Sequence, residues 1–124
     1  MTISEAIAMV DRLKPNQYPV SQKVMWLSRL DGKIFLELIS THEGGAESFE
    51  GYTDETDKET QLLVDAPYCD DIYNYYLQSM IDRENGEIAK YNQSGTLFNA
   101  SYLDYANYYN RMHLPLPVNA YFKF

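Results

Sequence analysis

A regular stripe of apolar and aromatic residues runs through the C-terminal half of the chain and constrains its fold most strongly. From Leu77 onward the stripe keeps a spacing close to seven residues per two helical turns, with Glu84 and Gly95 filling its two gaps. A phase sustained over this length is typical of helices that pack along one seam. The stripe consists of Ile72, Tyr73, Tyr76, Leu77, Met80, Ile81, Ile88, Tyr91, Phe98, Tyr102, Tyr105, Tyr109 and Met112.

The expected break in this half of the chain is the segment 92–95, which reads Asn-Gln-Ser-Gly. Ser94 is a residue type that caps the start of a new helix. We therefore predict two helices, over residues 68–92 and 95–113. One long bent helix across both ranges is the alternative.

A short helix is predicted at the N-terminus, over residues 2–14. Thr2 and Glu5 have the spacing of a capping box, in which each side chain binds the backbone N–H of the other residue. Apolar residues then recur at helical spacing. Pro15 ends the helix, because it disfavours the helical conformation of the residue before it.

A second, longer helix is predicted over residues 21–42, where apolar residues recur at steps of three and four. Asp31-Gly32 interrupts the pattern, but the apolar residues stay in phase across it. We therefore expect one continuous helix with a weak point, since glycine costs about 1 kcal/mol relative to alanine inside a helix. The apolar stripe of this helix is Val20, Val24, Leu27, Leu30, Ile34, Phe35 and Leu38.

The segment 43–67 is predicted to be a long acidic connection. Residues 44–67 hold seven acids and one base, a net charge of −6 out of −8 for the whole chain of 124 residues. The apolar run Leu62-Leu63-Val64 is expected to lie extended against the helices. Together these elements predict an all-α fold: a small bundle of about four helices in a single domain, residues 1–124.

The C-terminal tail, residues 114–124, is apolar and interrupted by prolines, so it cannot continue the preceding helix. We expect an extended tail that docks, either on its own domain or on a neighbouring subunit, because a free apolar tail in water is unfavourable. Its candidate interface residues are Leu114, Leu116, Tyr121, Phe122 and Phe124.

No catalytic constellation is recognisable, and we predict that the chain is not an enzyme. His42 and His113 are the only histidines, and each stands at the expected end of a helix, where the helix dipole favours it. Cys69 is the only cysteine, so no disulfide can form within the chain and a zinc site is not expected. We also expect no cofactor and no metal.

The acidic cluster in the connection is negative enough to attract a cation, but it lacks the ligand pattern and central glycine of a calcium loop. We interpret it as a solvated acidic loop, with a weak divalent-cation site as the alternative. Its members are Asp54, Glu55, Asp57 and Glu59.

Several classes of partner are excluded by charge and hydropathy. No basic patch is present to bind phosphates, so sequence-specific recognition of nucleic acid is not expected. No apolar run approaches the roughly 20 residues that span a membrane, and the N-terminus does not resemble a signal peptide. The stripe Tyr102, Tyr105 and Tyr109 could offer a base-stacking platform, but without a cationic groove it indicates packing in a core or an interface.

Motifs spread over nearly the whole chain resemble a group of small proteins encoded by prophages of Gram-positive bacteria. They are structural motifs rather than catalytic ones. They are Thr2-Ile3-Ser4-Glu5-Ala6, Val10-Asp11, Leu13-Lys14-Pro15-Asn16, Trp26-Leu27-Ser28, Leu30-Asp31-Gly32-Lys33-Ile34-Phe35, Ala66-Pro67-Tyr68, Asn85-Gly86-Glu87-Ile88, Tyr91-Asn92, Phe98-Asn99-Ala100 and Tyr109-Asn110-Arg111.

Within that group the chain is similar in size and helix pattern to the head–tail connector, or adaptor, proteins of tailed phages. The resemblance implies a helical bundle that forms a ring-like homo-oligomer and contacts neighbouring portal or tail proteins. It implies a place in the host cytoplasm during assembly and in the virion afterwards. The acidic loop Asp54, Glu55, Asp57 and Glu59 is then a candidate lining for the channel through which DNA passes.

Two alternatives remain open at this point. Another phage morphogenesis or capsid-associated protein would share the same features. A small regulatory module that binds a host protein would also need an acidic helical domain without a catalytic site.

Overall fold

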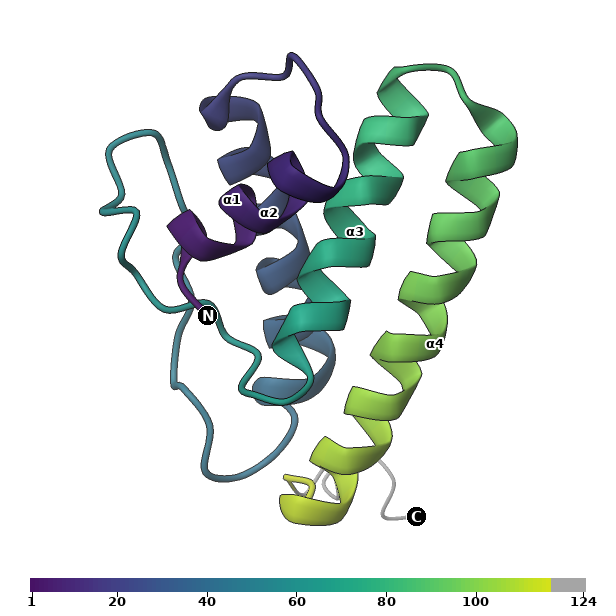
Figure 1. The fold of residues 1–124 in the computed structure, drawn as a ribbon. Helices are drawn as coiled ribbons and strands as arrows, with labels where there is room; N and C mark the ends of the chain where they lie inside the picture. The colour runs from purple at the N-terminus through teal and green to yellow at the C-terminus, as the bar shows by residue number, and fades with distance from the viewer. Residues whose placement is uncertain (117–124) are drawn as a thin grey trace, which may run out of the picture.

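The chain folds into a bundle of helices, as the apolar periodicity predicts (Figure 1). A computed structural model describes residues 1–116. Over these residues no strand forms, and the only extended pairings are two isolated bridges, Thr2 with Gln61 and His42 with Pro115. The elements are α1 (Ile3–Leu13), α2 (Val20–Ile34), the π-helical turn η1 (Phe35–Ile39), α3 (Cys69–Glu84) and α4 (Ile88–Met112).

Helix α1 begins with the predicted capping box. The Thr2 side chain accepts a hydrogen bond from the backbone N–H of Glu5 at 3.1 Å, and the Glu5 carboxylate accepts one from the backbone N–H of Thr2 at 2.9 Å. The hydrogen bond from the Thr2 backbone lowers the pKa of Glu5. Two N–H groups that a helix start would otherwise leave unpaired are thereby satisfied.

Helix α2 passes through Asp31-Gly32 without a break, which confirms the prediction of a continuous helix. It then widens into the π-helical turn η1, where the backbone N–H of Ser40 binds the carbonyl of Phe35 five residues earlier at 2.8 Å. The regular α-helix therefore ends at Ile34, and the helical segment as a whole ends at Ile39, three residues before the predicted end. Apolar spacing cannot distinguish an α-turn from a π-turn over so short a stretch.

The break between the last two helices lies at residues 85–87, so its predicted place at 92–95 is wrong. Gly86 adopts a left-handed backbone conformation, φ +74°, which glycine reaches without a steric cost. Ser94 lies inside α4, where its hydroxyl donates to the Asp82 carboxylate at 2.9 Å and contacts the Lys90 carbonyl. A serine bonded in this way supports the helix interior instead of capping a new helix.

Two glycine substitutions test this placement of the break. We expect Gly95→Ala to raise the free energy of unfolding by about 1 kcal/mol, because Gly95 is helical and a Cβ there meets nothing within 4 Å. We expect Gly86→Ala to lower it by about 1 kcal/mol, because the residue must keep a positive φ. Urea denaturation measures both, and a destabilising Gly95→Ala would contradict a continuous α4.

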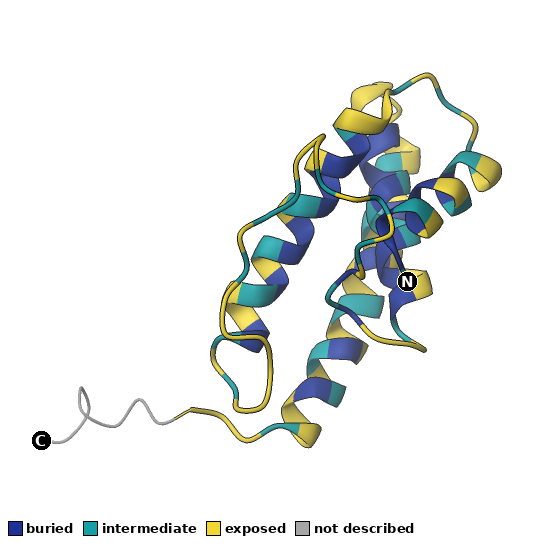
Figure 2. Cartoon of the chain, turned by 90° about the vertical axis from the view of Figure 1, so that its left-hand side faces the viewer, coloured by how far each residue is buried: buried dark blue, intermediate teal, exposed yellow. Residues whose placement is uncertain are grey.

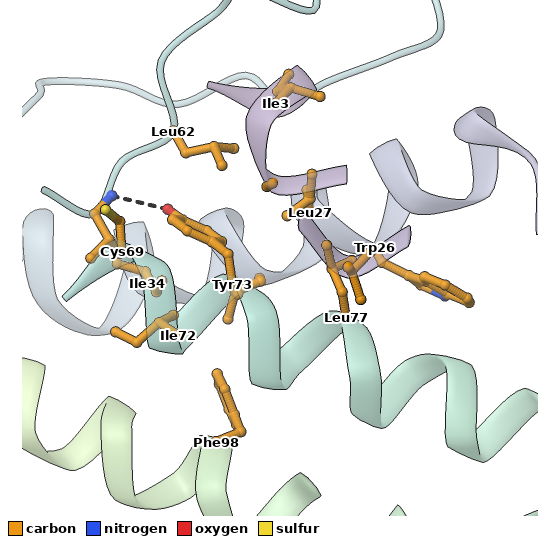
Figure 3. Close-up of a cluster of buried hydrophobic side chains, with 14 of the residues drawn as sticks. Ile3, Trp26, Leu27, Ile34, Leu62, Cys69, Ile72, Tyr73, Leu77 and Phe98 are labelled. Atoms are coloured by element: carbon orange, nitrogen blue, oxygen red, sulfur yellow. Dashed lines mark hydrogen bonds between the residues drawn. The ribbon is translucent and has the colours of Figure 1, made fainter. Parts of the chain in front are cut away.

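Helix α3 is the central element of the bundle (Figure 1). Helices α1 and α2 pack against it, and α4 packs antiparallel along it to form a helical hairpin. Buried positions lie on the sides of the helices that face one another, and exposed positions lie on their outer sides and in the connections (Figure 2). Trp26, Tyr73 and Leu77 are among the largest fully buried side chains (Figure 3).

The connection 43–67 packs on the bundle at several points. Leu62 and Val64 are buried, which confirms that this apolar run lies against the helices. The backbone N–H of Ile3 donates to the Thr60 carbonyl at 3.1 Å, and that of Leu62 donates to the Met1 carbonyl at 2.9 Å. The second half of the connection is thus attached to the start of α1.

A buried carboxylate, Asp31 of α2, fastens this connection from inside. It accepts hydrogen bonds from the hydroxyls of Tyr52 at 2.5 Å and Tyr73 at 2.6 Å, and from the backbone N–H of Leu63 at 3.0 Å. Burial raises the pKa of Asp31, and these three hydrogen bonds oppose the rise. The Tyr73 hydroxyl in turn accepts from the backbone N–H of Val64 at 2.9 Å (Figure 3). One side chain therefore links α2, α3 and two points of the connection.

Two ion pairs also join elements of the bundle. Asp82 of α3 is fully buried and binds both the ammonium of Lys14 and the hydroxyl of Ser94. Lys23 of α2 is 3% exposed and binds the Asp11 carboxylate of α1 at 2.7 Å. A buried charge is tolerated only when it is paired in this manner.

Candidate interaction surface

The two histidines lie together and serve local packing. His113 stacks on the Tyr109 ring with centroids 3.9 Å apart, and His42 meets the same ring edge-on at 5.4 Å. Their Nδ1 atoms contact backbone carbonyls, that of Leu38 for His42 and that of Glu43 for His113. The ring stacking and these carbonyl contacts join the end of α4 to the turn after η1.

Beside the two histidines, two segments of the chain approach each other so closely that only glycine fits at position 45. A Cβ on Gly45 would lie 2.6 Å from the Ile39 side chain and 2.7 Å from the Tyr109 hydroxyl. Gly45 therefore has a steric role beside the histidines. No signal in the sequence connected it with Tyr109, which is 64 positions away along the chain.

Cys69 begins α3 and is buried. Burial raises the pKa of its thiol, and the neighbouring Asp70 carboxylate raises it further. A thiol whose pKa is raised is a poor nucleophile at neutral pH. Over residues 1–116 no group of three or more His, Cys, Asp or Glu side chains is arranged to hold a metal ion.

The acidic side chains Asp54, Glu55, Asp57 and Glu59 are all exposed. They lie on two successive turns, closed by the bonds Thr56 N–H to Thr53 carbonyl and Thr60 N–H to Asp57 carbonyl, both 3.0 Å. The turns stand at the side of the bundle near α1, away from α4 (Figure 1). The acidic segment and α4 can therefore face different neighbours.

The predicted tyrosine stripe of α4 points inward in the single chain. Tyr105 and Tyr109 are buried, 3% and 5% exposed, so they pack within the chain's own core. Tyr102 is half-buried, and its hydroxyl donates to the Glu37 carboxylate at 2.6 Å. These contacts leave Tyr105 and Tyr109 without a surface to offer a partner. Burial raises the pKa of the Tyr102 and Tyr105 hydroxyls, as expected for side chains that pack inward.

The first residues of the tail run beside the turn after η1. The backbone N–H of Glu43 donates to the Leu114 carbonyl at 2.9 Å, and that of Leu116 donates to the Thr41 carbonyl at 2.8 Å. The side chains of Leu114 and Leu116 stay exposed, at 69% and 42%. The remaining candidate interface residues of the tail, Tyr121, Phe122 and Phe124, lie outside the described residues.

The opposite side of α4 is a helical surface that the described chain leaves exposed. Among the helical elements of the described residues, α4 packs on α3 and on η1, and Tyr68 and His42 of the connecting segments contact the same inward side. Charged residues make up 23% of the chain, yet the middle of this outward side carries none. We call it the α4 outer face: Ala89, Asn92, Gln93, Thr96, Asn99, Ala100, Leu103, Asn107 and Asn110, all of them exposed.

Charges appear only at one edge of the α4 outer face. Lys90, Asp104 and Arg111 follow one another there at intervals of fourteen and seven residues, with Leu97 between the first two. Leu97 is 42% exposed and Leu103 is 60% exposed. Large exposed apolar side chains within an uncharged surface are typical of sites of protein contact.

Comparison of the chain with known protein families, curated proteins and solved structures identifies no relative. No protein-family model matches the chain, and neither the curated proteins nor the solved structures contain a match. Among the described residues no helix is both long and apolar enough to cross a membrane.

Sequence reasoning missed two sets of residues. Asp31 stands four positions after Leu27, in phase with the apolar stripe of α2, and an acid in that phase signals a buried, hydrogen-bonded carboxylate. The α4 outer face lies on the side of the helix opposite the aromatic stripe, so an aromatic pattern does not indicate it. The distribution of charge around the helix would have pointed to it.

Proposed function

We propose that this chain is a structural subunit that works by protein contact, and that it is a head–tail connector or neck component of a tailed phage. One observation carries the contact role: the α4 outer face is long, uncharged and covered by nothing in the described chain. The phage assignment rests on the motifs that resemble prophage-encoded connector proteins. Such a subunit needs self-complementary surfaces rather than an enclosed pocket.

In this proposal the partners are further copies of the chain and the neighbouring portal or tail proteins. The chain assembles in the host cytoplasm and then belongs to the virion. The acidic turns at residues 53–60 and the α4 outer face lie on different sides of the bundle. This arrangement supports a division of roles, in which α4 contacts protein and the acidic turns repel passing DNA weakly, so that it does not adhere.

Deletion of the gene from its prophage tests the phage role. We expect induced particles to show filled heads without tails under the electron microscope, because a missing neck component prevents the two halves from joining. Supplying the gene in trans should restore complete virions. Normal virions without the gene would contradict the neck role and favour a regulatory module.

The same imaging tests the orientation of the acidic turns. A reconstruction of complete necks should place residues 50–60 toward the central channel. If these residues lie on the outer rim, they do not line the path of the DNA.

A further inference from the structure

We propose that two copies of this chain bind each other through their α4 outer faces, antiparallel, in one register set by Lys90 and Asp104. The proposal rests on the proposed function only in that the chain works by protein contact, and it does not need the phage assignment. It names the partner of the α4 outer face as a second copy and fixes which residues meet.

The spacing of the α4 outer face is that of a helix that pairs with another helix. Its middle line runs through Ala89, Gln93, Thr96, Ala100, Leu103 and Asn107, in alternating steps of four and three. Steps of this kind keep one seam facing a partner helix. All six side chains are exposed, so the seam is free in the single chain.

The small side chains of the seam allow a close approach of two helices. Ala89, Thr96 and Ala100 are short, and Leu103 supplies an apolar knob that is 60% exposed in the single chain. In an antiparallel pair Thr96 of one copy lies opposite Ala100 of the other. Gln93 then lies opposite Leu103, and Ala89 opposite Asn107.

Charge complementarity selects this antiparallel arrangement. In this register the residues on one flank of the seam meet as Lys90 with the second copy's Asp104, Leu97 with the second copy's Leu97, and Asp104 with the second copy's Lys90. The dimer therefore contains two equivalent ion pairs between Lys90 of one copy and Asp104 of the other. The two exposed Leu97 side chains meet on the two-fold axis. The other flank, Asn92, Asn99 and Ala106, is uncharged.

A parallel pair offers no such match. Each charged flank would then face the uncharged flank of the other helix, and Lys90 would find no acid. Surface ion pairs add little affinity, but they discriminate between registers and orientations. The Lys90 side chain is 64% exposed and makes one long contact within the chain, 3.4 Å to Glu87, so it is free to reach a partner.

A two-fold contact of this kind joins two copies and closes on itself. A ring would therefore need a second surface, or would have to open this pair. One helix face also lies at the small end of stable interfaces, so we expect a dissociation constant in the micromolar range.

Analytical ultracentrifugation of the full chain over a range of concentrations tests the proposal. We expect a reversible dimer. Lys90→Glu and Asp104→Lys should each weaken dimerisation about tenfold, because each turns two attractive pairs into two repulsive ones. The double variant Lys90→Glu/Asp104→Lys keeps the net charge of −8 and should restore the original affinity.

Matched controls separate the contact from a general effect of net charge. Arg12→Glu and Asp54→Lys make the same changes in charge at exposed positions away from α4, and should leave the dimer unchanged. Leu103→Glu should prevent dimerisation. Every substituted residue is exposed, so each variant should retain its helical circular dichroism and its cooperative thermal transition.

Cross-linking then tests the register. A short bis-maleimide should join two copies of Leu97→Cys, because these residues face each other on the two-fold axis. It should not join two copies of Asn107→Cys, which would lie about 27 Å apart along the helices. A chain that stays monomeric at about 1 mM overturns the proposal, as does a dimer that ignores the charge reversals or cross-links at position 107.

These outcomes are independent of the phage experiment. Normal virions without the gene would contradict the neck role and leave the dimer measurement untouched. A monomeric chain whose loss produces tailless heads would contradict the α4 pair alone.

Discussion

Replacement of Asp31 with alanine is expected to lower the free energy of unfolding by about 3 kcal/mol, a large fraction of the stability of a domain of this size. The variant removes the acceptor for three donors: the hydroxyls of Tyr52 and Tyr73 and the backbone N–H of Leu63. Each buried donor left unpaired costs roughly 1–3 kcal/mol. Relief from burying a carboxylate offsets part of this loss, since burial raises the pKa of Asp31. Equilibrium urea denaturation measures the difference.

Three variants serve as controls for Asp31→Ala. Asp54→Ala removes an exposed acid from the connection and should change stability by less than about 0.5 kcal/mol. Tyr52→Phe and Tyr73→Phe each remove one donor and should cost less than the alanine variant. The loss at Tyr73 should be the larger, because its hydroxyl also accepts from the backbone N–H of Val64. An Asp31→Ala variant as stable as the native chain would show that the network does not hold the connection.

The effect of Asp31→Ala should also depend on pH. The folded chain keeps the Asp31 proton to a higher pH than the unfolded chain, because burial raises its pKa above the ordinary 3.8. Its contribution to stability is therefore greatest below that value and is lost as the pH rises through the raised pKa. The stability difference between the native chain and the variant should narrow as the pH rises above 3.8. A difference that widens would contradict the raised pKa.

Replacement of Trp26 with alanine is expected to cost about 3–5 kcal/mol, the range for a large aromatic residue removed from a core. Trp26 is fully buried on α2, the helix that packs against both α1 and α3. The Tyr18 ring meets it edge-on at 5.7 Å. Alanine would leave a cavity that three helices cannot close without moving. Thermal unfolding followed by circular dichroism measures the loss.

The milder variant Trp26→Phe separates volume from hydrogen bonding. The indole Nε1 atom of Trp26 is buried and has no hydrogen-bond acceptor within the described chain. Replacement with phenylalanine therefore removes no hydrogen bond, and it should lower the free energy of unfolding clearly less than replacement with alanine. If both variants lose the same stability, the position depends on the shape of the indole and not on the volume that it fills.

The helical elements could be predicted from the sequence because their causes are local. The capping box of Thr2 and Glu5 and the apolar phase of α2 depend on residues within one or two turns. The same kind of local evidence led to a wrong prediction for the turn between α3 and α4. The segment 92–95 contains serine and glycine, but Gly86 is the glycine that adopts a positive φ. Both segments contain a glycine, and the structure places the turn between α3 and α4 at Gly86.

The candidate site followed from the sequence in part. The acidic segment could be located from charge alone, and its exposure agrees with that charge. The inward direction of Tyr105 and Tyr109 could not be deduced, because an aromatic stripe fits a core and an interface equally well. The choice depended on how many sides of α4 the rest of the chain covers. Over residues 1–116 the covered side is the one that faces α3 and η1.

The sequence by itself determined the class of fold, the number of helices and the place of the acidic charge, because helix periodicity and charge are properties of neighbouring residues. The tertiary structure alone decided which polar groups are buried and which helix face stays open. Asp31 gains its role from Tyr52 and Tyr73, which lie 21 and 42 positions away along the chain. The α4 outer face is open because no helix among residues 1–116 covers it. Both depend on contacts between distant segments, whose energies no local pattern records.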